Sequence, residues 1–216
     1  MRRQKQIGIL AAIVGAILIA CSQAYLSSSA PATPVAVSFG NLPQSKQPVT
    51  ILKNRGYTVG YSEAMRDPLW VCYTLKQADS NDERLRRPAG GFEMDPRTTA
   101  QITSHDYTRS GYDRGHMAPS YAIGKFHGRE AQKETFTMSN VVPQSHFCND
   151  GVWNSIERME SDDFAKRFNQ VEVVDGPVFD GNPARFPSGV AVPSAFYKSH
   201  STPGWGDDCF YRAPIS

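Results

Sequence analysis

Residues 112–120 of the 216-residue chain read YDRGHMAPS, and this stretch carries the most specific chemistry in the sequence. Side chains alternate along a strand, so Arg114 and His116 are expected on the same face. A neutral imidazole, whose ordinary pKa is about 6.5, accepts a proton from water at neutral pH. A neighbouring guanidinium holds a phosphate through two parallel hydrogen bonds. We therefore predict His116 as a general base and Arg114 as a catalytic and phosphate-binding residue. The alternative for His116 is a hydrogen-bonded loop histidine.

A second informative stretch, residues 137–157, reads TMSNVVPQSHFCNDGVWNSIE. Apolar residues recur every three or four positions from Asn149 to Phe168, a spacing that predicts a helix. Asn149, Trp153 and Glu157 then follow one another along one stripe of that helix. Asn149 and Glu157 are separated by about 12 Å along the axis, so both cannot hold one ion directly. Trp153 is expected in the core, and Asn149 is also a good candidate for the helix N-cap.

The two stretches, in this order and at this separation, resemble the DNA/RNA non-specific endonuclease family, the ββα-metal nucleases of the endonuclease G type. The resemblance extends to NRGY at 54–57, PLW at 68–70 and VPSAFYK at 192–198, and so covers about residues 50–198. It implies magnesium-dependent hydrolysis of phosphodiester bonds in DNA and RNA with little sequence preference and with 5′-phosphate products. Mn²⁺ often replaces Mg²⁺ where oxygen ligands dominate.

The resemblance also implies roles for individual residues. Asn149 is expected to be the direct protein ligand of Mg²⁺, with water in most other positions, as this strongly hydrated ion prefers. Glu157 is expected to be a catalytic residue that acts through water or by orientation. Asn140 is expected to bind substrate phosphate or to orient His116, the alternative being a hydrogen bond at the end of a strand.

The segment 76–112 is irregular, and a long irregular segment in a compact domain is more often functional than idle. The resemblance places a phosphate-binding arginine here, either Arg87 or Arg86. A solvated run of charges is the better interpretation for most of the neighbouring residues.

Extended segments interrupted by one long helix predict an α+β fold with a mainly antiparallel sheet and a ββα-metal nuclease core. Strands are predicted at 57–61, 69–75, 136–142, 171–174, 189–192 and 195–197. Pro143 and the Gly176-Pro177 pair are expected to end two of them. After Lys198 the resemblance stops, and the tail shows no clear strand or helix pattern. We therefore expect the C-terminal elements of the fold to be truncated.

The N-terminus is typical of an export signal. Arg2, Arg3 and Lys5 precede an apolar run of 14 residues, 7–20, which is shorter than the roughly 20 residues of a membrane-spanning helix. The run ends at Cys21 in a sequence that resembles a bacterial lipobox. We predict a signal peptide at 1–21, a Ser-, Ala- and Pro-rich linker at 22–46 and the nuclease domain at 47–216. The product would be an exported lipoprotein tethered to the membrane of the cell envelope. An uncleaved anchor is the alternative.

Removal of residues 1–20 lowers Lys plus Arg from 23 to 20 against 21 Asp plus Glu, so the formal charge becomes −1. Many nucleic-acid-binding proteins carry a strong basic excess, so the nuclease prediction depends on the local site alone. Two other functions compete with it. One is a catalytically impaired envelope lipoprotein that acts as a binding module, and the other is a metallohydrolase of a different phosphodiester.

Overall fold

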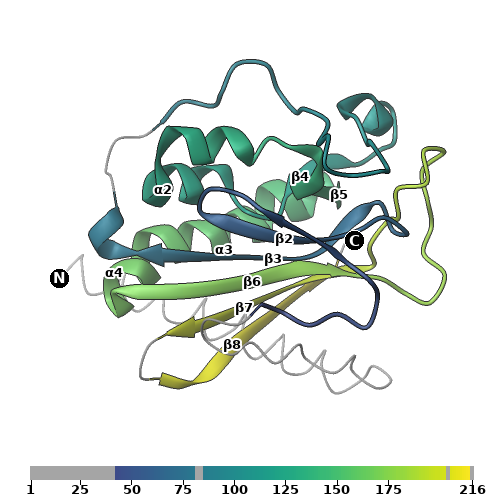
Figure 1. The fold of residues 1–216 in the computed structure, drawn as a ribbon. Coiled ribbons are helices and arrows are strands. Elements are labelled where there is room, and N and C mark those ends of the chain that lie inside the picture. The colour runs from purple at the N-terminus through teal and green to yellow at the C-terminus, as the bar shows by residue number, and fades with distance from the viewer. Residues whose placement is uncertain (1–41, 81–84, 203–204, 215–216) are drawn as a thin grey trace. The chain divides into compact units, whose positions relative to one another are not determined.

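The computed structural model describes residues 42–80, 85–202 and 205–214, the last of these as backbone only. Its main element is an antiparallel sheet in the order β1-β2-β3-β6-β7-β8. The strands are β1 Thr50–Lys53, β2 Tyr57–Ser62, β3 Asp67–Lys76, β6 Gln170–Val178, β7 Ala195–Thr202 and β8 Trp205–Pro214. Figure 1 shows the helices gathered over one face of this sheet.

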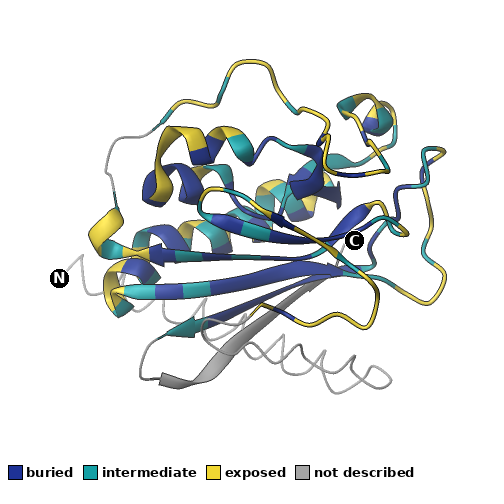
Figure 2. Cartoon of the chain, in the orientation of Figure 1, coloured by how far each residue is buried: buried dark blue, intermediate teal, exposed yellow. Residues whose placement is uncertain are grey.

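The core lies between that face and the helices α2 Ser120–Glu134, α3 Asn154–Met159 and α4 Ala165–Phe168. Ile123 and Phe126 of α2 pack in the same apolar cluster as Val71, Val173 and Phe196 of the sheet. The central strands are accordingly buried along most of their length, whereas the outer surface of α2 is exposed (Figure 2). Burial of these apolar surfaces is the main force that holds the helices on the sheet.

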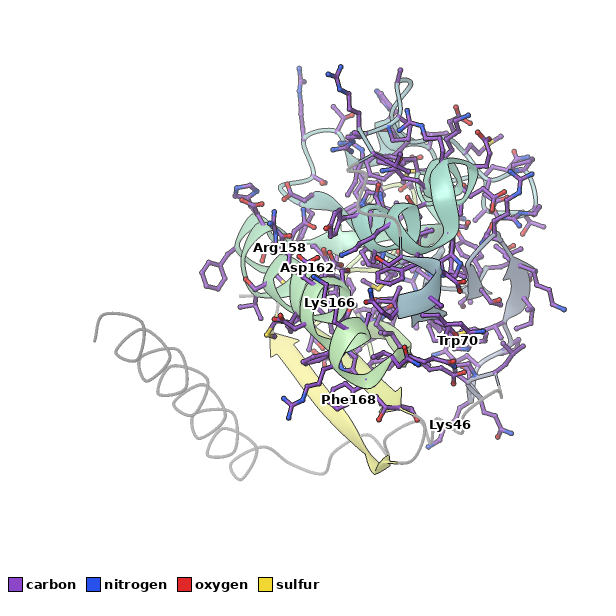
Figure 3. All side chains as sticks on the ribbon, turned by 90° about the vertical axis from the view of Figure 1, so that its left-hand side faces the viewer. Lys46, Trp70, Arg158, Asp162, Lys166 and Phe168 are labelled. Atoms are coloured by element: carbon purple, nitrogen blue, oxygen red, sulfur yellow. The ribbon has the colours of Figure 1, made fainter. Side chains whose placement is uncertain are left out.

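A second, two-stranded ribbon pairs β4 Asp113–His116 with β5 Val141–Gln144 in antiparallel register. A continuous helical segment follows from 146 to 168. Two wide π turns interrupt it, Cys148–Trp153 and Glu160–Phe164, on either side of α3. Arg158, Asp162 and Lys166 follow one another along this segment (Figure 3). The ribbon and the helix together form a ββα unit, which contains most of the predicted site residues.

The predicted α+β class and antiparallel sheet are confirmed, as are the strands at 57–61 and 69–75 and the long helix. Other boundaries were wrong. Residues Met138–Asn140 form a 3₁₀ turn, and the strand there begins only at Val141. Pro143 lies inside β5, because a two-stranded ribbon tolerates a residue without an N–H at an edge.

Strand β6 likewise continues past Gly176-Pro177 to Val178. Its pairing with β3 ends at Asp175, so Pro177 pairs with β7 alone and removes no hydrogen bond to a second strand. The predicted strand at 189–192 is reduced to one bridge, between Arg185 and Ala191.

Helix α2 has no counterpart in the sequence prediction. Its apolar pattern is weakened by Gly124 and Gly128, and the latter has a φ of 85° that breaks the helix internally. Ala122, Ile123 and Phe126 nevertheless supply one buried face. The helix is held by this packing rather than by its intrinsic propensity.

The expectation that the tail after Lys198 lacks strand structure was wrong. Strand β7 runs on to Thr202, and β8 pairs with it from Trp205 to Pro214. The polar residues Lys198 and His200 concealed the strand, because both are buried and face polar partners rather than apolar ones.

The predicted signal peptide and nearly all of the predicted linker fall within residues 1–41, outside the described residues. Among the described helices, none is long and apolar enough to cross a membrane.

Candidate active site

The ββα unit places His116 at the end of β4, opposite Val141 of β5. Gly115 precedes it and lies against the buried side chain of Gln144, which a Cβ atom at Gly115 would overlap. A larger residue at this position would have to displace the Gln144 side chain. The YDRGH stretch is thus a strand whose close packing fixes the backbone of His116.

The imidazole of His116 lies between two aromatic rings. Its centroid is 5.0 Å from that of Phe92 and 4.9 Å from that of Phe136, which meets it edge to face. Burial, together with the positive charge of Arg87, lowers the pKa of His116 to about 3. Atom Nε2 is buried and makes no hydrogen bond with any described residue. The ring is therefore neutral at physiological pH and carries a nitrogen that can accept a proton.

Arg87, rather than Arg86, lies beside His116. The Arg87 guanidinium is 4.9 Å from the ring centroid of Phe136 and 5.5 Å from that of Phe92. Arg86 contributes its carbonyl to a hydrogen bond from Arg129. A cation over an aromatic face is stabilised by the ring quadrupole, so the two rings hold Arg87 next to the base.

The sequence prediction did not include Phe92 and Phe136. Phe136 belongs to a segment that was interpreted only as a strand, and Phe92 follows the Gly90-Gly91 pair in the irregular segment. Their aromatic character was visible in the sequence, but their convergence on His116 depends on tertiary structure.

Arg114, two residues before His116 in β4, makes its contacts with a different segment. Its Nε and one terminal nitrogen donate to the carbonyl of Ser104, at 3.2 and 2.7 Å. The guanidinium also lies 5.9 Å from the ring centroid of Tyr107. Two of its five N–H groups are thus used to hold the 3₁₀ turn Ser104–Tyr107 against β4.

Asn149 is connected to β4 through Asp113. Its Nδ2 donates to Oδ2 of Asp113 at 3.1 Å, and Nδ1 of His146 lies 2.9 Å from the same oxygen. The hydrogen bond with Asp113 raises the pKa of His146. The helical segment begins at His146, and the hydroxyl of Ser145 accepts from the N–H of Cys148 at 3.2 Å, so the capping alternative for Asn149 is wrong. Asp113, which precedes His116 by three residues, instead orients the Asn149 amide through this hydrogen bond.

Asn140 is fully buried, and its amide is used by the protein backbone. Oδ1 accepts from the N–H of Ala118 at 2.8 Å, and Nδ2 donates to the carbonyls of Ala118 and Thr135, both at 3.0 Å. The backbone carbonyl of Asn140 also accepts from the N–H of Met117. The predicted contact between Asn140 and substrate is therefore not supported. Its side chain fixes the backbone just after His116.

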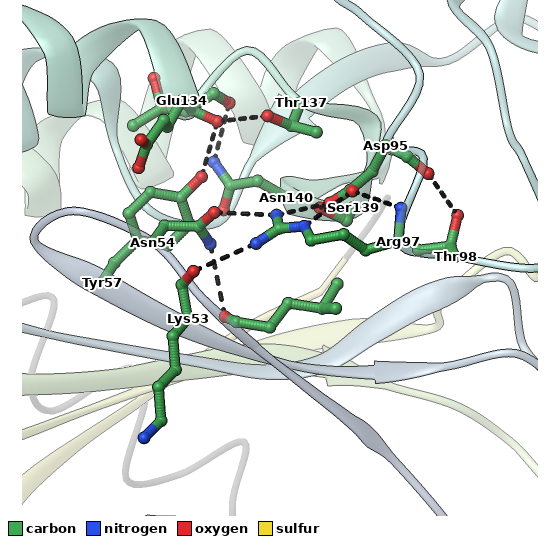
Figure 4. Close-up of polar contacts among 12 residues, drawn as sticks. Lys53, Asn54, Tyr57, Asp95, Arg97, Thr98, Glu134, Thr137, Ser139 and Asn140 are labelled. Atoms are coloured by element: carbon green, nitrogen blue, oxygen red, sulfur yellow. Dashed lines mark hydrogen bonds and ion pairs between the residues drawn. The ribbon is translucent and has the colours of Figure 1, made fainter.

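The neighbouring Ser139 ties this segment to a polar cluster shown in Figure 4. Its hydroxyl donates to Asp95 at 2.6 Å, and Asp95 pairs with Arg97, also at 2.6 Å. Arg97 reaches on to the carbonyl of Lys53 and the side chain of Asn54. Part of this cluster lines a pocket of about 410 Å³, to which none of the predicted site residues contributes.

Glu157 is half-buried and lies close enough to Lys198 of β7 for that cation to influence its pKa. Burial raises its pKa to about 8, Lys198 opposes that shift, and Glu160 and Asp175 add to it. Its Oε1 is buried without a hydrogen bond to any described side chain or backbone group. Trp153, one helical turn earlier, is in the core as predicted.

Glu157 neighbours a buried polar network that the sequence prediction did not include. Lys198 of β7 donates to Tyr73 of β3 at 2.9 Å and to Asp175 of β6 at 2.7 Å. Tyr73 donates to Glu160 at 2.9 Å, and His200 lies 2.5 Å from the other oxygen of Glu160. The network thus joins three strands to the helical segment that carries Asn149 and Glu157.

The amide oxygen of Asn149 and the neighbouring carboxylate of Asp113 suit a hydrated, hard cation. Among the described residues no three His, Cys, Asp or Glu side chains converge to hold a metal ion, which does not favour a fully protein-ligated site. Asp113 already engages the nitrogen of the Asn149 amide and so leaves its oxygen for a ligand. Mg²⁺ keeps several waters when it binds protein, so one amide oxygen with water suits this ion.

The profile of the DNA/RNA non-specific endonuclease family matches residues 36–205. Mitochondrial nuclease EXOG of Xenopus laevis is 39% identical over 136 residues, 61% of this chain and 37% of that protein. EXOG of Homo sapiens is 36% identical over 167 residues, 70% of this chain and 44% of that protein. Mitochondrial endonuclease G of Homo sapiens is 34% identical over 135 residues, 59% of this chain and 43% of that protein.

Among solved structures, the crystal structure of the EndoG/EndoGI complex contains a similar chain. The TM-score is 0.67 at 26% sequence identity, with 77% of this chain and 74% of that chain covered. The present chain spans 37–44% of the length of the three curated relatives named above.

Proposed function

Because this chain belongs to the DNA/RNA non-specific endonuclease family, we propose that it hydrolyses phosphodiester bonds within DNA and RNA, with His116 as the general base and a divalent metal ion at Asn149. The observation that carries the proposal is the neutral His116 ring, whose buried Nε2 makes no hydrogen bond with the described protein. It belongs to the same ββα unit as Asn149, which Asp113 links to β4.

In the proposed reaction Nε2 of His116 removes a proton from a water molecule, and the oxygen of that water attacks phosphorus. The bond from phosphorus to the 3′ oxygen breaks, which leaves a 5′-phosphate on one product, and the departing 3′ oxygen takes a proton from solvent to become the hydroxyl of the other. Mg²⁺, or Mn²⁺ in its place, supplies positive charge that stabilises the developing negative charge. Asn149 would hold the ion through its amide oxygen, and Glu157 would contribute to the site through water. His116 would thus supply the base, and the ion held by Asn149 would supply the charge stabilisation.

Phosphate binding is assigned to Arg87 and Arg114. Arg87 is exposed and lies over the two rings that flank His116, so its guanidinium is close to the base and open to solvent. Arg114 uses only part of its donor set on Ser104. Contacts of this kind recognise the backbone of a nucleic acid and not its sequence.

The alternative of an impaired binding module depended on a tail without secondary structure. Since β7 and β8 extend through residues 195–202 and 205–214, that reason no longer applies. A metallohydrolase of small phosphodiesters is distinguished from the nuclease by its substrates.

Export remains a separate proposal that rests on the sequence of residues 1–21. Labelling with a radioactive fatty acid tests it: wild type should be labelled, and Cys21→Ala should not. Equal labelling of the two proteins, or none of wild type, overturns the lipoprotein assignment.

The nuclease proposal is tested by incubating the purified protein with plasmid DNA and with RNA, in Mg²⁺ or in chelator. We expect nicking and linearisation of DNA and degradation of RNA only with metal. His116→Ala should lower the rate by 10²–10⁴-fold, the usual contribution of a general base. The matched control is His105→Ala, because His105 is exposed and outside the site. Cleavage of small diesters alone, or equal loss in both variants, contradicts the proposal.

A further inference from the structure

Arg129 of α2 connects that helix to the irregular segment beside the proposed active site. One terminal nitrogen of its guanidinium donates both to the backbone carbonyl of Arg86 and, at 3.0 Å, to Oε1 of Gln132. Gln132 is buried, so its amide is a fixed acceptor that orients the exposed Arg129 side chain. The bond to Arg86 thus joins two segments that are 43 residues apart in the sequence.

The local conformation of α2 explains how Arg129 and Gln132 come together. Gly128, directly before Arg129, has a φ of 85°, a left-handed conformation that residues with a side chain rarely adopt. Arg129 therefore opens the second helical stretch of α2. Gln132 follows it by three residues, an interval at which helical side chains are neighbours.

Charge pairing does not explain an arginine at this position. Arg129 takes part in no salt bridge with any described residue, although Glu130 is next to it. Glu130 pairs instead with Arg55 and Lys133. The printed contacts of Arg129 are with a backbone carbonyl and an amide, so its role is better sought in the segment that it holds.

The backbone held by Arg129 leads directly to Arg87, the residue after Arg86. The Arg87 guanidinium lies over the rings of Phe92 and Phe136, which flank the proposed base. The attraction between a cation and an aromatic face is weak where the cation is exposed to water, as it is here. Ring contacts alone therefore hold this long side chain loosely, and its backbone needs an attachment of its own.

The segment 86–93 is attached to the rest of the protein at both ends. At its far end the N–H of Glu93 donates to the carbonyl of Phe136 at 2.9 Å, and the carbonyl of Glu93 accepts from the N–H of Met138 at 2.8 Å. Between the two ends lies a Gly-Gly pair at 90–91, with φ angles of 107° and 75°. Glycine backbone is intrinsically flexible, so the far attachment cannot by itself fix the near end of the segment.

We propose that Arg129 is a positioning residue, which holds Arg87 beside His116 through the carbonyl of Arg86. The inference rests on the nuclease function proposed for this chain and deepens it, because it makes the grip on substrate phosphate depend on helix α2. Arg129 then acts on the nucleic acid through Arg87 and not by a contact of its own.

The test is a double-mutant cycle of Arg129→Met and Arg87→Gln. Lys133→Met is the matched control, since it removes the same charge one turn later in α2. The Kd for a labelled DNA duplex is measured in chelator, and KM and kcat in Mg²⁺. One hydrogen bond corresponds to a factor of about 2–10, so Arg129→Met should raise Kd and KM by that factor with kcat nearly unchanged. Arg129→Lys, which keeps a cationic donor, should lose less, and Lys133→Met should match wild type.

Arg129→Met should add nothing to the loss in Arg87→Gln, because the side chain that it positions is then absent. Additive losses would show that Arg129 contacts phosphate itself and would overturn the inference. Unchanged Kd and KM in Arg129→Met, or equal losses in Arg129→Met and Lys133→Met, also overturn it. Absence of cleavage by wild type in Mg²⁺, with the cycle in Kd as expected, would contradict the nuclease function alone.

Discussion

The ammonium group of Lys198 lies 2.7 Å from Oδ2 of Asp175, and neither side chain is exposed to solvent. Burial lowers the pKa of Lys198, but the carboxylates of Asp175 and Glu160 raise it more, so the lysine stays charged. Burial raises the pKa of Asp175 to about 7, against the opposing effect of Lys198. The charge of Lys198 is thus balanced by acidic groups on a strand and on the helical segment.

This pair predicts a large loss of stability in Lys198→Met. The methionine fills a similar volume, but it leaves Asp175 and Glu160 buried without their cation. Removal of one partner from a buried pair typically costs about 3–5 kcal/mol. Urea denaturation at pH 7 should show a loss of this size.

The double variant Lys198→Met/Asp175→Asn should recover part of that loss, because it removes one of the uncompensated carboxylates. A midpoint for Lys198→Met equal to that of wild type would contradict the assigned role. The network joins β3, β6 and β7 to the helical segment that carries Asn149. We therefore also expect the variants that remain folded to bind the metal ion more weakly, so that cleavage needs a higher metal concentration.

A second prediction concerns the pH dependence of cleavage. His116 acts as a base only when neutral, and its pKa is lowered to about 3. Its protonation should therefore not reduce kcat/KM between pH 5 and pH 8. Arg87→Gln removes the smaller cause of that shift while burial remains, so the acid limb should move upward by a fraction of a pH unit.

The matched control is Arg86→Gln, which changes the same charge one residue away. Its profile should coincide with that of wild type. A wild-type acid limb near pH 6.5 that disappears in His116→Ala would belong to His116. That result would contradict the lowered pKa of the ring.

The chemistry of the ββα unit could be predicted from the sequence because it is local. Arg114, His116 and Asn149 belong to two short stretches that are recognised by their order of residues. Helix periodicity placed Asn149 on the helical segment, whereas no strand was predicted at β4. The confirmed strands β2 and β3 also follow local alternation, joined by a tight turn in which Arg66 has a φ of 59°.

The contacts around these residues could not be predicted in the same way. Phe92 and Phe136 meet at His116 from segments more than 40 residues apart, and no periodicity indicates that meeting. Lys198 and His200 appear to be polar tail residues in the sequence, yet they lie inside a strand that faces Glu160. The alternation of apolar and polar residues does not reveal a strand whose buried face is itself polar.

A third prediction follows from the Asn140 amide. Asn140→Asp replaces the Nδ2 donor with an oxygen that faces the carbonyls of Ala118 and Thr135. Each buried group left without its partner costs about 1–3 kcal/mol, so the free energy of unfolding should fall by at least that amount. Because the backbone after His116 shifts, kcat should fall more than KM rises.

A substrate-binding role would produce the opposite result for Asn140. KM would then rise in Asn140→Asp while the urea midpoint stayed the same. Thr137→Val is a useful control, since it removes a nearby hydroxyl that donates to the carbonyl of Glu134 and not to the Asn140 amide.

The last prediction concerns Glu157, whose pKa is raised by burial from 4.5 to about 8. A raised pKa in the folded state means that folding favours the protonated acid. This contribution is fully present below the unfolded value of 4.5 and is lost as the pH rises through about 8. Glu157→Gln stays neutral at every pH, so in chelator it should match wild type near pH 4.5 and exceed it at pH 8, by roughly 4 kcal/mol. Urea denaturation across this range measures the difference, with the exposed Glu93→Gln as control. A difference that stays constant with pH would mean that Glu157 is ionised in the folded protein, held by a compensating charge beyond Lys198.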